Sequence, residues 1–222
     1  YHYRYRWFGI PAPRLRDTRA FWIARGATWM ADVTGAGPGV QEDNARMNTI
    51  FVEELRQVAF HRLLDVGCGY GLRLKPVCVA RPDATFVGFD LSPTMLDSAR
   101  VYLAGVANLA LVEADAAAMP FPDGSFDAAI TWGTLEAIPP AGMRRALREI
   151  RRVVRGTVVS IEEEGSGDWE QARWAEERAM ARWYFPYDFA AEFQAAGFLI
   201  RKRYDLDDLN EMRPTVYVLE SA

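Results

Sequence analysis

Three alternating glycines follow an apolar run and an acidic residue in the second quarter of the chain. Residues 63–71 read Leu-Leu-Asp-Val-Gly-Cys-Gly-Tyr-Gly. Glycine lets the backbone approach a ligand where a Cβ atom would block it, and the first turn of a following helix leaves N–H groups unpaired. The segment therefore predicts a strand, a tight turn and a helix, with a small polar ligand at the turn.

An acidic residue follows at a distance typical of nucleoside recognition. The apolar run 85–89 ends at Asp90, which is 19 residues after Gly71. A carboxylate at the end of the second strand of an α/β unit meets ribose hydroxyls at about this spacing. Ser92 and Pro93 supply an N-cap and a first-turn proline for a helix, which places Asp90 at the end of its strand. We therefore expect a nucleoside ligand.

Apolar patterns of strand and helix period alternate along the chain, which is typical of an α/β fold with a mostly parallel sheet. The expected strands cover residues 62–66, 85–90, 109–113, 126–132 and 157–162, and the expected helices cover 71–80, 93–105, 140–155 and 187–196. Two last strands, 198–204 and 215–219, are predicted to form an antiparallel hairpin at the sheet edge.

Composition narrows the class of protein. The chain has 222 residues and a formal net charge of −4, which argues against a general nucleic-acid or membrane-surface binder. The two cysteines, Cys68 and Cys78, suggest neither a disulfide framework nor a metal cluster, and no export leader is visible. We expect a cytoplasmic setting without a metal, a membrane or a nucleic-acid partner. The chain begins at Tyr1 rather than at methionine, so native residues can precede it.

Four motifs in order resemble the class I S-adenosylmethionine-dependent methyltransferases: the glycine segment, Asp90, Glu113-Ala-Asp-Ala and the run 121–131. The resemblance covers residues 45–222. It implies a seven-stranded, mostly parallel sheet with helices on both faces, S-adenosylmethionine as cofactor and S-adenosylhomocysteine as product. An N-terminal helical, aromatic arm of residues 1–44 lies outside this core, and a helical insertion is expected after the fifth strand.

Nicotinamide-binding Rossmann proteins are the natural competitor, because they share the glycine turn and the acidic residue. Their third glycine would stand at position 72, where this chain has Leu72, and the glycine is Gly71 instead. Asp65, two residues before the first glycine, is also a methyltransferase feature. The spacing favours S-adenosylmethionine over a dinucleotide.

The resemblance assigns the cofactor to residues at the ends of the first four strands: Asp65, Gly67, Cys68, Gly69, Gly71, Asp90, Leu91, Asp115, Ala116, Thr131 and Trp132. The glycines would wrap the methionine portion, and Asp90 would accept hydrogen bonds from both ribose hydroxyls. Leu91 would lie against the adenine. Asp115 would accept from the adenine amine beside the Ala116 backbone, and a turn cap is the alternative for Asp115.

The acceptor site is expected in residues 131–136, after the fourth strand. Many small-molecule members of the family read Leu-Glu-His here, whereas this chain reads Leu135-Glu136-Ala137, so a histidine base is missing. Glu136, a tyrosine such as Tyr184, or water would have to accept a proton. This departure favours an amine or an acidic hydroxyl as acceptor.

Aromatic residues, most of them outside the common core, are the candidates for binding the acceptor. They come from the arm, the end of the fourth strand, the insertion 168–184 and the segment that follows it: Trp22, Trp29, Trp132, Trp183 and Tyr187. Such rings could bury an apolar acceptor and stabilise a cation. Plain core packing is expected for half or more of the aromatic residues in these segments.

Negative observations disfavour nucleic-acid substrates. No Asn/Asp-Pro-Pro-aromatic sequence follows the fourth strand, and no Pro-Cys nucleophile exists. The arginines of helix 140–155 fit a solvated face better than a phosphate-binding stripe. The leading hypothesis is therefore O- or N-methylation of a small molecule by a monomer or homodimer. The alternatives are a protein or RNA methyltransferase and a catalytically silent cofactor-binding regulatory subunit.

Overall fold

The computed structural model describes residues 18–165, 185, 187–206 and 214–221 of the chain. Its strands are β1 (Arg62–Val66), β2 (Thr85–Asp90), β3 (Leu109–Glu113), β4 (Phe126–Trp132), β5 (Val154–Glu163), β6 (Phe198–Asp205) and β7 (Pro214–Ser221). Its helices are α3 (Thr18–Thr34), α4 (Pro38–Arg56), α5 (Leu74–Ala80), α6 (Pro93–Tyr102), the short 3₁₀ turn η1 (Leu135–Ala137), α7 (Pro140–Val153) and α9 (Phe189–Ala195).

The strands form one seven-stranded sheet in the order β3-β2-β1-β4-β5-β7-β6. Neighbours from β3 to β5 pair in parallel, and β7 pairs antiparallel with both β5 and β6. The predicted α/β class and the predicted edge hairpin are confirmed. The hairpin folds back so that its second strand, β7, lies inside the sheet and β6 forms the edge.

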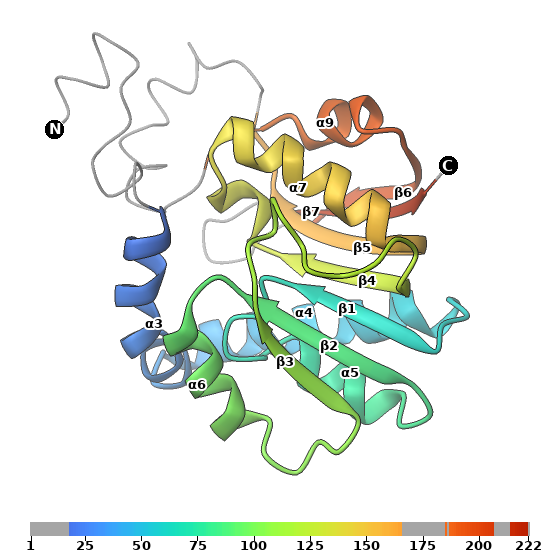
Figure 1. Cartoon of the computed structure of the whole chain (residues 1–222). Helices are drawn as coiled ribbons and strands as arrows, with labels where there is room; N and C mark the ends of the chain where they lie inside the picture. The colour runs from blue at the N-terminus through green and yellow to red at the C-terminus, as the bar shows by residue number, and fades with distance from the viewer. Residues whose placement is uncertain (1–17, 166–184, 186, 207–213, 222) are drawn as a thin grey trace, which may run out of the picture.

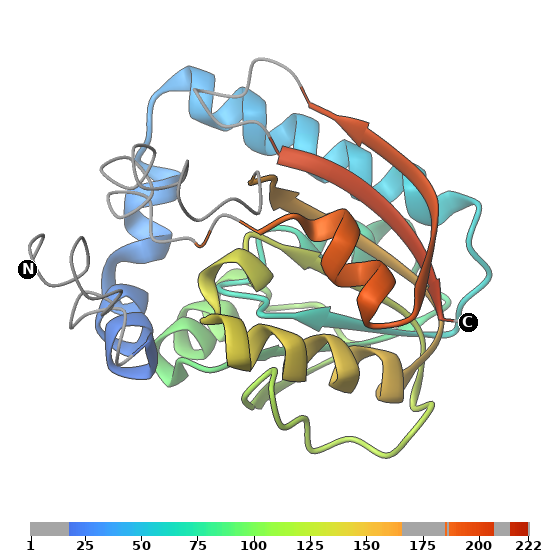
Figure 2. The same ribbon diagram turned by 90° about the horizontal axis from the view of Figure 1, so that it is seen from above.

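Helices cover both faces of this sheet (Figures 1 and 2). α7 and α9 lie on one face, and α4 and α5 lie on the other. The buried residues of α7 recur at helical spacing and fill the first face: Met143, Ala146, Leu147, Ile150 and Val153. The sheet therefore separates two apolar layers, and polar side chains gather at the carboxyl ends of the parallel strands.

Local geometry moved several predicted element boundaries. α5 begins at Leu74 rather than at residue 71, because Gly71 has φ +91° and continues the turn. β5 begins directly after α7, where Gly156 lies against β4. A Cβ atom at Gly156 would come within 2.1 Å of the carbonyl oxygen of Asp127, so only glycine fits there.

In the part of the chain that the structure describes, two helices, α3 and α4, precede the first strand. α3 packs against α6, and Gly26 of α3 makes the approach possible, since a Cβ atom there would lie 2.4 Å from Oγ1 of Thr94. Arg19 of α3 forms an ion pair of 2.5 Å with Glu113 at the end of β3. The predicted boundary after residue 44 falls inside α4, and the helix continues without a break from the arm into the core.

Candidate functional site

The glycine turn after β1 requires glycine for two reasons. Gly67, Gly69 and Gly71 have φ values of +69°, +53° and +91°, which side-chain-bearing residues rarely adopt. In addition, a Cβ atom at Gly67 would lie 2.4 Å from Cγ2 of Thr134, and one at Gly71 would lie 2.4 Å from Cδ1 of Leu103. The turn is thus packed closely against the loop that follows β4.

Asp90 at the end of β2 is joined to this turn. Its Oδ2 accepts a hydrogen bond of 2.9 Å from the backbone N–H of Gly69, and its Oδ1 accepts one of 2.9 Å from Ser92. Burial raises the pKa of the Asp90 carboxyl, and the backbone N–H donors oppose that rise. A carboxylate has about four acceptor sites, so acceptor capacity remains for a ligand hydroxyl.

Asp65, at the end of β1, is buried beneath the turn with an exposed fraction of 4%. Burial, followed by the charge of Asp90, raises its pKa to about 8, and the positive charge of Arg73 opposes the rise. Oδ2 of Asp65 has no hydrogen-bond partner within the part of the chain that the structure describes. Next to it, Cys68 is also buried, and burial raises the pKa of its thiol.

Arg73 links the turn to α4. Its Nη1 donates to the carbonyl of Asn44 and to Oδ1 of Asn48, both at 3.0 Å, and its Nη2 donates to Oδ1 of Asn44 at 2.7 Å. Its guanidinium lies over the ring of Trp132, 3.9 Å from the ring centroid. One face of Trp132, a predicted ligand-binding ring, is therefore covered by Arg73.

A buried carboxyl pair lies at the ends of β4 and β5. Oε1 of Glu162 accepts from the Thr131 hydroxyl at 2.9 Å, and its Oε2 accepts from the backbone of Glu136 at 3.3 Å. The side chain of Glu136 in turn accepts from the backbone N–H of Glu163. Burial raises the pKa of both carboxyls, that of Glu162 to about 8, and their mutual repulsion raises that of Glu136 further.

Two of the predicted site residues have their side chains engaged in other contacts. Thr131 is fully buried, and its hydroxyl donates to Glu162, so its side chain is not available to a cofactor. Asp115 is exposed, and its Oδ1 accepts a hydrogen bond of 2.8 Å from the backbone of Ala117, which is the turn-capping arrangement. Ala116 beside it is buried and Leu91 half-buried. The adenine contacts of these residues stay predictions.

The predicted aromatic residues fall into three groups. Trp22 and Trp29 lie half-buried on α3 with their rings edge to face, 6.3 Å apart. Tyr187 belongs to the core with 3% of its surface exposed, and its hydroxyl donates to the carbonyl of Ile138 at 2.7 Å. This position gives Tyr187 a packing role. Trp183 and Tyr184 lie outside the described residues, so their predicted roles are not addressed by the structure.

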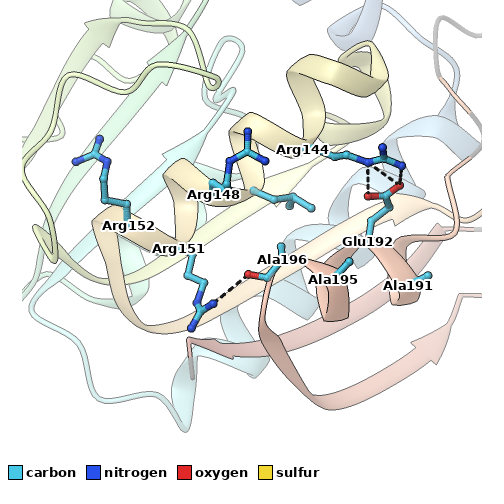
Figure 3. Close-up of a pocket in the computed structure, with 9 residues that line it drawn as sticks. Arg144, Arg148, Arg151, Arg152, Ala191, Glu192, Ala195 and Ala196 are labelled. Atoms are coloured by element: carbon cyan, nitrogen blue, oxygen red, sulfur yellow. Dashed lines mark hydrogen bonds and ion pairs between the residues drawn. The ribbon is translucent and has the colours of Figure 1, made fainter.

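Four arginines of α7 border a groove between α7 and α9 (Figure 3): Arg144, Arg148, Arg151 and Arg152. Arg144 holds Glu192 of α9 through both carboxylate oxygens, and Arg151 donates to the carbonyl of Ala196 at 3.2 Å. Arg152 pairs with Glu149 and Asp123. Intramolecular pairing therefore accounts for these three arginines, in keeping with the interpretation as a structural and solvated face.

The sheet order, the antiparallel last strand, the glycine turn and Asp90 together define the fold of the class I S-adenosylmethionine-dependent methyltransferases. Residues 63–156, less than half of the chain, match a family model described as a methyltransferase domain. The resemblance stated from the sequence is confirmed at the level of this domain.

Known proteins with similar sequences carry the same description. A malonyl-[acyl-carrier protein] O-methyltransferase of Legionella pneumophila is 37% identical over 98 residues, which are 44% of this chain and 34% of that protein. A demethylmenaquinone methyltransferase of Roseiflexus castenholzii is 38% identical over 103 residues, which are 46% of this chain and 42% of that protein. The chain thus spans less than half the length of either relative.

The fold extends further than the sequence similarity. The crystal structure of a magnesium protoporphyrin IX methyltransferase from Synechocystis with bound S-adenosylmethionine covers 95% of this chain and is itself covered to 99%. The TM-score is 0.68 and the sequence identity is 14%. At such an identity the match concerns the fold alone.

The residues present fit the cofactor that this fold implies. The turn is open at Gly69, where a Cβ atom would have nothing within 4 Å, and Asp90 offers its carboxylate to the ribose. Oδ2 of Asp65, beside the turn, is buried and has no partner among the described residues. An unpartnered polar atom is costly when buried, and a charged ligand group would remove that cost.

Three contributors to the site were missed from the sequence. Asn44 and Asn48 stand four residues apart on one helical face, and Arg73 is a lone charge between Leu72 and Leu74. The sequence features that could have pointed to these residues are a pair of asparagines at helical spacing and a charged residue between two leucines. Neither shows by itself that the two segments meet.

Proposed function

We propose that the chain is an S-adenosylmethionine-dependent methyltransferase that transfers a methyl group to an oxygen or nitrogen atom of a small molecule. The observation that carries the proposal is the carboxylate of Asp90 held at 2.9 Å from Gly69 in a turn of positive-φ glycines. The methyltransferase domain of residues 63–156 and the names of the relatives support it.

The residues of the chain mainly bind and orient in this reaction. The cofactor supplies a methyl group on a positively charged sulfur, which is a strong electrophile. Asp90 binds the ribose, and the glycine turn admits the rest of the ligand to close backbone contact. Correct positioning and exclusion of water can then provide much of the rate enhancement. The absence of a histidine at Ala137 is compatible with such a reaction.

The choice between oxygen and nitrogen rests on the proton that the acceptor must lose. Glu136 and Glu162 lie at the carboxyl ends of the strands, and burial raises the pKa of both carboxyls, which increases their affinity for a proton. We propose Glu136 as the group that receives the proton. The Legionella relative is named an O-methyltransferase, which supports oxygen as one acceptor.

The setting is proposed from two observations. Among the described residues, no helix combines the length and hydropathy needed to cross a bilayer. Cys68 and Cys78 are both buried and unbridged, as is common in a reducing compartment. We therefore propose a cytoplasmic enzyme.

Calorimetric titration of the purified chain with S-adenosylmethionine and with NAD tests the cofactor. Tight binding of NAD without binding of S-adenosylmethionine would contradict the proposal. Transfer of a labelled methyl group from the cofactor into a metabolite extract tests the reaction, with the Asp90→Ala variant as control. Label in protein or RNA alone would favour a macromolecular acceptor, and binding without any transfer would favour a silent subunit.

A further inference from the structure

Arg73 is a buried cation whose position is determined by four contacts. Only 5% of its surface is exposed. Asn44 accepts from it through both its carbonyl and its side chain, and Asn48 accepts through its side chain. Stacking on Trp132 sets the plane of the guanidinium. A long side chain that is held this firmly loses little further entropy when it binds a ligand.

The hydrogen bonds of Arg73 leave two donors. A guanidinium has five N–H groups, and the three printed bonds use two on Nη1 and one on Nη2. One N–H remains on Nη2 and one on Nε, and Nε has no partner among the described residues although it is buried. Two donors on neighbouring nitrogens can bind both oxygens of one carboxylate.

An acidic side chain, Asp65, also lies next to this glycine turn. Oδ2 of Asp65 is buried and has no partner in the described part of the chain. Asp65 and Arg73 act on each other electrostatically, yet no hydrogen bond or ion pair joins them within the described residues. A turn with one unsatisfied acid and one unsatisfied cation matches a ligand that carries both charges, as an α-amino acid does.

We propose that Arg73 binds the carboxylate at the amino-acid end of S-adenosylmethionine, with Asp65 facing the ammonium group of the same ligand. The inference rests on the proposed function. Asn44 and Asn48 of α4 position the guanidinium, so the helix before the first strand contributes to cofactor recognition. Arg73 then makes the site select the intact cofactor over nucleosides that lack the amino acid.

The test pairs a substitution in the protein with a truncation of the ligand. S-adenosylhomocysteine and 5′-methylthioadenosine share the adenosine and the thioether, and only the first carries the amino acid. Isothermal titration of the whole chain should show that Arg73→Met weakens S-adenosylhomocysteine at least tenfold and methylthioadenosine less than twofold. Arg73→Lys should retain part of the discrimination, because it keeps the charge and loses the fork.

Arg81 provides a matched control. It follows the same helix, stacks over Phe60 at 4.0 Å from the ring centroid and donates to the carbonyl of Phe60 at 2.9 Å. It lies before β2, at the opposite end of the sheet from the glycine turn. Arg81→Met should change the affinity for neither ligand by more than twofold.

Each outcome decides the inference. Equal weakening of both ligands by Arg73→Met, or no weakening, overturns it. If Arg73→Met does not fold, the wild-type chain is titrated with the methyl ester of S-adenosylhomocysteine: a tenfold loss, reduced in Arg73→Lys, supports the inference, and no loss overturns it. A wild-type chain that binds no adenosyl ligand would contradict the proposed function itself, whereas binding that is indifferent to Arg73 would contradict the inference alone.

Discussion

The carboxylate of Asp90 accepts a hydrogen bond from the backbone N–H of Gly69 at 2.9 Å, which joins the end of β2 to the middle of the glycine turn. The two elements are 21 residues apart in the sequence. The same carboxylate accepts from Ser92 at the start of α6. Asp90 therefore has a structural role in the turn before any ligand binds. The same hydrogen bonds fix the orientation of its carboxylate toward a ligand.

Asp90→Ala should weaken S-adenosylhomocysteine at least tenfold, because hydrogen bonds to a charged group contribute about 1.5–3 kcal/mol each. Isothermal titration measures the loss. Asp97→Ala is the control, since Asp97 lies exposed on α6 and pairs with Arg100. An affinity for the ligand that Asp90→Ala leaves unchanged would contradict the assigned role.

Gly67→Ala should destabilise the fold by about 2–5 kcal/mol, the sum of a positive-φ penalty and an overpacking penalty. The overpacking arises against Thr134. Adding Thr134→Ala should recover the steric part and leave about 1–2 kcal/mol from the backbone. Chemical denaturation of the wild type, both single variants and the double variant gives the free energies of unfolding for a double-mutant cycle. Full recovery, or none, would show that only one of the two penalties exists.

Glu162→Gln should change how stability depends on pH. The pKa of Glu162 is raised from 4.5 to about 8 in the folded state, so between these values the folded state binds the proton more tightly than the unfolded state. Wild-type stability therefore falls as pH rises from 5 to 8, by at most about 1.4 kcal/mol per pH unit from this group. Glutamine cannot ionise, so the variant should lose less over this range. Denaturation at several pH values measures both slopes, and parallel slopes would contradict the prediction.

Gly26→Val should detach α3 from α6, because even a Cβ atom at residue 26 would meet Thr94 at 2.4 Å. We expect faster proteolysis within α3 and a red-shifted emission from Trp22 and Trp29, with the melting temperature of the core little changed. Gly37→Ala is the control, since a Cβ atom at residue 37 has nothing within 4 Å. Equal proteolysis of the two variants would show that the Gly26 contact does not hold α3.

Local patterns predicted the strands well because their signals lie within a few residues. β1, β2, β3 and β4 have the predicted bounds, since each apolar run is closed by a turn signal. α5 started three residues late, because the left-handed conformation of Gly71 continues the turn into the sequence that looked helical. The spacing of apolar residues carries no information about such a backbone conformation.

The candidate site was only partly predictable. The glycine turn and Asp90 are a contiguous motif and a fixed spacing, and the structure joins them. The burial of Tyr187 depends on residues that are distant in the sequence, and the side-chain hydrogen bond of Asp115 depends on the local conformation of its turn. Residue spacing reveals neither. The position of Glu162 behind Thr131 follows from the register of β4 and β5.

By itself the sequence determined the class of fold, the glycine turn and the nature of the ligand, because these depend on local backbone freedom and on alternating apolar periods. Only the tertiary structure decided that Asn44 meets Arg73, 29 residues away, and that Oδ2 of Asp65 is buried without a partner among the described residues. Contacts of this kind arise when two helices, here α4 and α5, pack side by side on the same face of a sheet and bring polar groups into a shared, poorly solvated space. The free energy of that desolvation depends on the assembled surroundings and is absent from any single segment.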